Sequence, residues 1–226
     1  MADILARLKR LFRLRFAVLY PLAVYLVFFT VPTDASMRAG AVFMVAGMFM
    51  RLWSNGYAIK LDKLTTSGPY AYVRNPLYVG TGLILVGVVV MLQVLWLGLA
   101  ALVVMGFVYK RTILNEQKML TDKFGTDFLD YCARVPAMWP AWRPYPKGEK
   151  WPFSVQRIWA SREHKVVLWM AILVIGFYVK REFLIDGGRA DAKIIFLVAL
   201  ACVFGLIDLL SEYIRYRQKK DLKEAE

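Results

Sequence analysis

Gly68–Gly80 combines residues that restrict the backbone with residues that form hydrogen bonds. It reads Gly-Pro-Tyr-Ala-Tyr-Val-Arg-Asn-Pro-Leu-Tyr-Val-Gly and runs directly into an apolar stretch. Glycine permits unusual backbone angles and proline imposes its own, while the tyrosines, the arginine and the asparagine can all form hydrogen bonds. A plain connector between membrane helices needs none of this chemistry. We therefore expect this segment, here called the polar collar, to hold a polar ligand at the membrane face.

Arg111 and Glu116 are a second pair of chemically capable residues, in a polar segment after the next apolar run. Five positions apart on a helix, they differ by about 140° around its axis, so each can face a separate part of a ligand. Glu116 can accept hydrogen bonds from an ammonium group, and Arg111 can bind a carboxylate or a phosphate. The alternative is an ordinary solvated helix end beside the membrane. Both residues are candidate catalytic residues.

The elements that position these residues are apolar helices. The chain has 226 residues, of which 59% are hydrophobic, and this is too apolar for an ordinary soluble domain. We predict an all-α polytopic membrane helical bundle with about six spans in three hairpins, and with a pocket at its cytoplasmic face. The expected spans are Phe16–Val31, Gly40–Trp53, Leu77–Leu92, Val94–Tyr109, Val166–Val179 and Ile194–Leu210.

Leu77–Tyr109 is an apolar run of 33 residues in which Gln93 is the only strongly polar interior residue. One helix of that length would extend about 50 Å, whereas the hydrocarbon core of a bilayer is about 30 Å thick. The run is therefore predicted to form a helical hairpin that turns near Gln93. An amphipathic helix follows it, for which Gly125 is the expected end. Because the two polar segments flank this hairpin, they meet at one membrane face and can form a composite pocket.

Charge predicts the orientation of the chain. The net charge is +13, and placing both termini in the cytoplasm puts 25 of the 30 lysine and arginine residues on that side, as the positive-inside rule requires. We expect a multi-pass protein of a bacterial inner membrane or plasma membrane, or of the endoplasmic reticulum in a eukaryote. The basic residues are assigned to topology and to attraction by membrane lipids, and no nucleic-acid partner is expected.

Three regions are expected along the chain. Residues 1–55 form a basic helix and the first hairpin, residues 56–145 form the core with the two polar segments, and residues 146–226 form a connection rich in proline and tryptophan followed by the third hairpin.

Several other chemistries are disfavoured. His164 is the only histidine, so neither a histidine-dependent triad nor a multi-histidine metal site is expected. Cys132 and Cys202 predict neither a disulfide nor a metal site. Gly80 lies inside an apolar helix, where a missing side chain either permits close helix packing or lets a ligand approach. Asp208, near the end of the last expected span, is expected to pair with a basic neighbour or to reach water.

The polar collar, together with Glu116 and the later Phe124-Gly125 and Arg134-Val135-Pro136, resembles the integral-membrane methyltransferases of the isoprenylcysteine carboxyl methyltransferase and phospholipid methyltransferase group. The resemblance covers about Trp53–Pro140. It implies that S-adenosylmethionine binds at the cytoplasmic face, that a lipidic acceptor enters from the membrane, and that Arg111 lies near this acceptor. It also implies that a set of residues contributes to the cofactor pocket, and these are Tyr72, Arg74, Asn75, Tyr78 and Glu116. Further candidate cofactor-binding residues are Gly80, Tyr131 and Arg134.

Two departures from the family pattern bear on the acceptor and on how the ammonium group of the cofactor is held. Asn75 stands where the carboxyl methyltransferases usually have histidine and the phospholipid enzymes often have asparagine, and Asn115 stands where a glutamate usually precedes Glu116. The expected function is methyl transfer from S-adenosylmethionine to an isoprenylcysteine-type carboxylate or a phospholipid amine. Two alternatives are an NAD(P)H-dependent membrane reductase of sterol-like lipids and a lipid-binding relative without catalysis.

Overall fold

In the computed structural model, the described residues are 25–26, 28–59, 63–185, 187 and 191–224, and within them the chain is helical and without strands. This confirms the predicted all-α class. The elements, in chain order, are α4 (Asp34–Tyr57), the short 3-10 helix η1 (Gly68–Ala71), α5 (Pro76–Leu92), α6 (Leu95–Arg134), α7 (Val155–Ala160), α8 (Glu163–Ile185) and α9 (Ala192–Glu224). Most of the first expected span, Phe16–Val31, lies outside the described residues.

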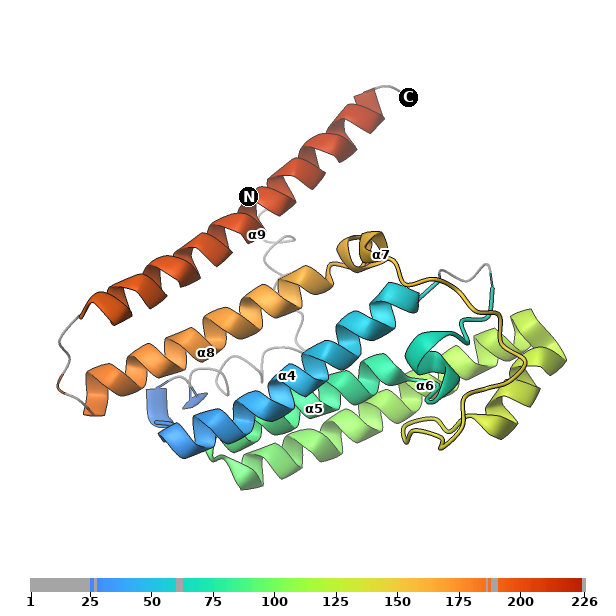
Figure 1. Ribbon diagram of the computed structural model, residues 1–226, viewed down its shortest axis with the longest axis horizontal. Coiled ribbons are helices and arrows are strands. Elements are labelled where there is room, and N and C mark those ends of the chain that lie inside the picture. Colours follow the sequence, from blue (N-terminus) through green and yellow to red (C-terminus); the bar gives the residue numbers. More distant parts are fainter. Residues whose placement is uncertain (1–24, 27, 60–62, 186, 188–190, 225–226) are drawn as a thin grey trace, which may run out of the picture.

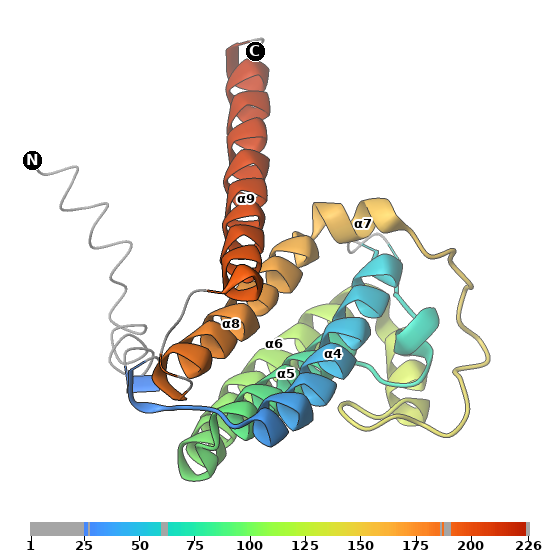
Figure 2. The ribbon, with the colours of Figure 1, turned by 60° about the vertical axis from the view of Figure 1, so that its left-hand side comes forward.

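Among the described residues, three helices are long and apolar enough to cross a membrane: α4, α6 and the Ala192–Ile214 part of α9. The 17 residues of α5 are also apolar, whereas α8 carries charged residues near both ends. Each expected span after residue 31 falls on one of these helices. The helices α4, α5 and α6 lie side by side, α8 lies next to α4, and α9 lies beyond α8 (Figure 1, Figure 2). The cytoplasmic position of both termini stays a prediction.

Glycines allow α4 and α5 to pack very closely. A Cβ atom on Gly40 would lie 2.5 Å from the carbonyl oxygen of Gly87, and one on Gly47 would lie 2.5 Å from that of Gly80. Membrane helices use small residues at their interfaces because these let backbones approach. Of the two interpretations of Gly80, close packing is the one seen here, since a Cβ atom at this position would also lie 2.7 Å from Cγ of Arg51.

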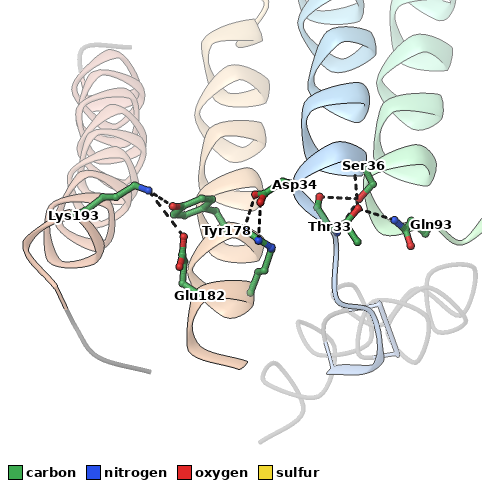
Figure 3. Close-up of polar contacts among 8 residues, drawn as sticks. Thr33, Asp34, Ser36, Gln93, Tyr178, Glu182 and Lys193 are labelled. Atoms are coloured by element: carbon green, nitrogen blue, oxygen red, sulfur yellow. Dashed lines mark hydrogen bonds and ion pairs between the residues drawn. The ribbon is translucent and has the colours of Figure 1, made fainter. Parts of the chain in front are cut away.

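At the end of the bundle away from the polar collar, polar contacts join the α5–α6 turn and α8 to the start of α4 (Figure 3). Gln93 ends α5 with a left-handed backbone (φ 57°), which confirms the predicted turn. Its amide donates a hydrogen bond of 3.0 Å to the hydroxyl of Thr33, and Thr33 forms a capping box with Ser36 at the start of α4. Arg181 of α8 donates hydrogen bonds of 2.6 and 2.8 Å to the carboxylate of Asp34.

The long helix α6 is interrupted at Gly125. Its φ of 54° and ψ of −127° are not helical, so the predicted end of the amphipathic helix is confirmed. The chain beyond Gly125 contains a small buried cluster, which is formed by Phe128, Tyr131 and Val135. The chain changes direction at Gly125 and returns to the polar collar, where the backbone N–H of Arg74 donates a hydrogen bond to the carbonyl oxygen of Pro136.

Ion pairs join the start of α8 to α9. Nζ of Lys165 lies 2.9 Å from the carboxylate of Asp208 and 2.6 Å from that of Glu212. Arg162, just before α8, lies 3.0 Å from Glu212. Asp208 therefore pairs with a basic neighbour, as predicted.

Candidate functional site

A cavity of about 280 Å³ lies between the polar collar, the chain that follows α4, and α6. Ligand sites usually measure about 300–1,000 Å³, so this cavity is near the lower limit for a small organic molecule. Because the first turn of α5 lines it, the cavity lies at the end of the bundle opposite Gln93. The polar collar and the polar segment around Glu116 thus meet at one cavity, as expected from the hairpin between them. The titratable lining residues are Lys63, Tyr70, Arg74, Tyr78, Glu116 and Tyr131.

Tyr78 and Glu116 connect the two sides of this cavity. Pro76 starts α5 and places Tyr78 in its first turn, and the neighbouring α6 brings Glu116 to the same level. The Tyr78 hydroxyl donates a hydrogen bond of 2.9 Å to Oε1 of Glu116, and the ring centroids of Tyr78 and Tyr109 are 4.4 Å apart. A carboxylate has about four acceptor positions, so Glu116 can accept further hydrogen bonds from a ligand while Tyr78 orients it.

Arg74 brings a positive charge to the same cavity. Its Nη1 lies 2.7 Å from Sγ of Cys132, while its Nε is buried and has no hydrogen-bond partner among the described residues. A buried donor without a partner costs about 1–3 kcal/mol, so an acceptor atom from a ligand would stabilise this side chain.

The chain after α6 holds the polar collar in place. The carbonyl oxygen of Ala137 accepts hydrogen bonds from both the backbone N–H (3.2 Å) and the side-chain amide (3.0 Å) of Asn75. The backbone N–H of Arg74 donates to the carbonyl oxygen of Pro136 over 2.9 Å. Asn75 also lines the cavity. Its side-chain nitrogen donates one hydrogen bond to the chain after α6.

Two tyrosines line the cavity next to each other. Tyr131, which follows the break at Gly125, donates a hydrogen bond of 2.6 Å to the carbonyl oxygen of Tyr70. Burial raises the pKa of Tyr70, and the negative charge of Glu116 raises it further. Burial also raises the pKa of Tyr131 and outweighs the opposing effect of Arg74. Both phenols therefore stay neutral at pH 7 and can act as hydrogen-bond donors.

Lys63 forms part of the cavity wall and is held by the connection between α6 and α7. Its ammonium lies 4.6 Å from the centre of the Trp151 ring and 3.2 Å from the carboxylate of Glu149. The backbone N–H of Trp151 donates a hydrogen bond of 2.8 Å to the hydroxyl of Ser67. Residues far apart in the sequence thus hold this wall together.

The cavity brings together part of the predicted site. The predicted residues that line it are Arg74, Asn75, Tyr78, Glu116 and Tyr131. Gly80 instead lies in the contact between α4 and α5. Tyr72 has an exposed fraction of 36%, and Arg111 and Arg134 are exposed on α6. None of these four lines the cavity, and their roles stay predictions.

Sequence reasoning missed other lining residues. Leu120 and Phe124 line the cavity from α6; their spacing of four residues predicted an amphipathic helix but did not by itself indicate a ligand. Tyr70 belongs to the polar collar, but nothing distinguished it from the other tyrosines. Lys63 had no local signal at all, because only folding brings it to the cavity.

Residues 35–127 match the model of the phospholipid methyltransferase family. The matched segment runs from α4 to just beyond Gly125 and includes the polar collar and Glu116. This segment is therefore similar to that family, which confirms the resemblance to the isoprenylcysteine and phospholipid methyltransferase group. Helices α7, α8 and α9 lie outside the match.

Two curated relatives match the chain over part of its length. The cobalt-zinc-cadmium resistance protein CzcN of Cupriavidus metallidurans is 32% identical over 107 residues, which cover 46% of this chain and 49% of the relative. The nickel-cobalt-cadmium resistance protein NccN of Alcaligenes xylosoxydans xylosoxydans is 31% identical over 108 residues, which cover 47% of this chain and 50% of the relative. The chain thus spans about half the length of these relatives. No solved structure matches it.

Proposed function

We propose that this protein transfers a methyl group from S-adenosylmethionine to a lipidic acceptor at the membrane face. The observation that carries this proposal is the meeting of Glu116, Arg74 and three tyrosines at one cavity, within a chain segment that matches a methyltransferase family. The family match supports a membrane methyltransferase. The cofactor is proposed from the chemistry of the cavity, and the lipidic acceptor from the surroundings of Arg111 on α6.

The cavity residues fit the amino-acid part of S-adenosylmethionine. Glu116, oriented by Tyr78 over 2.9 Å, would accept hydrogen bonds from the ammonium group. Arg74, whose buried Nε has no partner among the described residues, would bind the carboxylate. Leu120 and Phe124 offer apolar surface to the rest of the molecule. When bound, the cofactor supplies a methyl group that its sulfonium makes electrophilic.

Arg111 is the residue that we propose to bind the acceptor. It is exposed on α6, and apolar residues around it on this helix are exposed as well: Phe107 by 72%, Val108 by 56% and Leu114 by 55%. An arginine that follows an exposed apolar stretch of helix can extend to the membrane interface and hold an anionic lipid group there. We therefore propose that Arg111 binds the headgroup of an acceptor that approaches from the bilayer.

The remaining task of the protein is alignment. Holding the acceptor's nucleophile in line with the methyl group and excluding water can lower a barrier by up to about 7–11 kcal/mol. A carboxylate acceptor needs no base. An amine acceptor must first lose a proton, either to water or to Glu116, the one carboxylate among the described lining residues. The names of the two relatives refer to metal resistance and specify no acceptor, so both acceptor classes are proposed.

Calorimetric titration of the purified protein with S-adenosylhomocysteine and with NADPH tests the cofactor. We expect S-adenosylhomocysteine to bind and Glu116→Gln to weaken its binding about 10-fold or more, because a hydrogen bond to a charged group contributes about 1.5–3 kcal/mol. Asp122→Asn changes an exposed carboxylate on the same helix and should leave the affinity unchanged. Binding of NADPH alone would favour the reductase alternative. Binding of neither compound by folded protein would refute the proposal.

Transfer of a labelled methyl group to fractionated membrane lipids tests the acceptor. Arg111→Gln should slow turnover while leaving the affinity for S-adenosylhomocysteine unchanged, since Arg111 does not line the cavity. Lys118→Gln removes another exposed positive charge from α6 and is the matched control. Equal turnover in the two variants would remove Arg111 from the acceptor site.

A further inference from the structure

Two tryptophans on the connection after α6 are far more exposed than a folded chain requires. Trp142 has an exposed fraction of 99% and Trp139 one of 80%. Tyr72, on the polar collar beside this connection, is exposed by 36%. These three aromatic residues are here called the aromatic surface. They lie outside the cavity lining, so the geometry of the cavity does not explain their exposure.

The backbone around the aromatic surface is held firmly. The backbone N–H of Ala141 donates a hydrogen bond of 2.7 Å to the carbonyl oxygen of Tyr72. The backbone N–H of Tyr145 donates a hydrogen bond of 2.9 Å to the carbonyl oxygen of Ala71. The side-chain hydroxyl of Tyr145 donates a further hydrogen bond of 2.9 Å to Asp130. Trp142 lies between these attachment points, so its exposure is built into the fold and is not the result of a loose end.

The aromatic surface lies at the level where α5 becomes apolar. Asn75 immediately precedes Pro76, the first residue of α5, and its backbone and side chain both donate to the carbonyl oxygen of Ala137. Trp139 follows Ala137 by two residues. Tryptophan and tyrosine gather at the boundary between membrane and water, because the ring is apolar while one end can hydrogen-bond.

The charge of this segment has one sign. Residues 131–147 contain three basic and no acidic side chains. Arg134 and Lys147 both pair with Asp130, over 3.3 and 3.2 Å. Arg143, next to Trp142, is exposed and has no ion-pair partner among the described residues. Arg143, the basic residue of this segment that does not pair with Asp130, is complementary to the anionic headgroups of a membrane surface.

We propose that the aromatic surface inserts Trp139 and Trp142 into the headgroup region of an anionic membrane, with Arg143 bound to a lipid phosphate. Arg74 and Asn75 belong to the same stretch of chain as Tyr72 and line the cavity. The insertion therefore holds the cavity at headgroup depth. This proposal does not depend on the proposed methyl transfer, since it concerns a surface outside the cavity.

Quenching of tryptophan fluorescence in nanodiscs tests the insertion. The full chain contains seven tryptophans, so the signal of interest is the difference between the unchanged protein and Trp139→Phe/Trp142→Phe. We expect lipids brominated near the headgroup to quench this difference signal about twofold more than lipids brominated near the bilayer centre. Trp96→Phe, which removes a residue exposed by 84% at the start of α6, is the matched control for losing an exposed tryptophan.

Two results would overturn the insertion. If aqueous acrylamide quenches the difference signal fully and brominated lipids do not, the aromatic surface lies in water. If neither quenches it, another protein surface covers it, for example a second copy of this chain. The anionic partner is tested by brominated phosphatidylglycerol against brominated phosphatidylcholine. Brominated phosphatidylglycerol should quench more strongly than brominated phosphatidylcholine in the unchanged protein, and Arg143→Gln should remove this difference between the two lipids. Equal quenching by the two lipids in the unchanged protein would overturn the role of Arg143.

Discussion

A buried ion pair attaches the C-terminal helices to the segment that matches the methyltransferase family. Arg51 of α4 donates hydrogen bonds of 2.9 and 2.6 Å to the two carboxylate oxygens of Glu163 at the start of α8. The side chain of Glu163 is exposed by only 8% and that of Arg51 by 19%. The two-point geometry is the strong form of this interaction, because two parallel hydrogen bonds accompany the charge attraction.

Glu163→Gln keeps the size of the side chain but leaves the charge of Arg51 uncompensated. Removing one member of a buried pair costs about 3–5 kcal/mol. Because Arg51 keeps some contact with solvent, we expect the lower end of this range, about 3 kcal/mol. A loss of 1 kcal/mol lowers the melting temperature by about 2–4 °C in a chain of this length, so the expected decrease is about 6–12 °C.

Thermal unfolding in detergent measures this effect, and the chain offers a matched control. Glu149→Gln breaks the exposed pair with Lys63, whose side chains are exposed by 62% and 53%, and should cost less than about 1 kcal/mol. The double variant Arg51→Met/Glu163→Leu replaces the pair with apolar contacts and should recover most of the lost stability. The reasoning fails if Glu163→Gln melts no lower than Glu149→Gln.

Three further changes have defined outcomes. Gly47→Ala should destabilise the protein by about 1–3 kcal/mol, because its Cβ atom would lie 2.5 Å from a backbone oxygen of α5. Gly106→Ala should be tolerated, since a Cβ atom there meets no atom within 4 Å. Equal melting temperatures of the two variants would contradict the packing argument. Tyr131→Phe removes the hydrogen bond of 2.6 Å to the Tyr70 carbonyl and should cost about 1–3 kcal/mol in chemical unfolding; an unchanged unfolding midpoint would show that this bond contributes nothing. Because burial raises the pKa of Tyr70 above its usual 10.0, its contribution to stability is complete below pH 10 and declines as the pH rises further. Melting temperatures measured across this alkaline range should therefore fall less steeply in Tyr70→Phe, and parallel curves would refute the assignment.

Much of the fold could be predicted because its signals are local. Gln93 was the only strongly polar residue inside a long apolar run, and a polar residue there is most easily accommodated at a turn. Gly125 could take up backbone angles that end a helix, and it does so with φ 54°. The polar collar and Glu116 could be assigned to one membrane face, since an intervening hairpin returns the chain to the side from which it started.

The residues that line the cavity could be predicted only in part. The sequence shows charged or hydrogen-bonding side chains in the polar segments at Arg74, Tyr78 and Glu116, and all three line the cavity. Tyr72 has the same residue type as Tyr78, yet its carbonyl is held by Ala141 and its side chain is partly exposed outside the cavity. Residue type indicates what a side chain can do, whereas its direction depends on neighbours that come from elsewhere in the chain.

The sequence by itself determined the all-α class, the turn at Gln93 and the presence of a polar site at one end of apolar helices. These features follow from hydrophobicity and backbone preference, which act over a few residues. Only the tertiary structure decided that Glu163 pairs with Arg51 across 112 positions, and that Lys63 is held beside Trp151. Such contacts depend on how helices and connecting segments from distant parts of the chain come together, and no local pattern of residues encodes that arrangement.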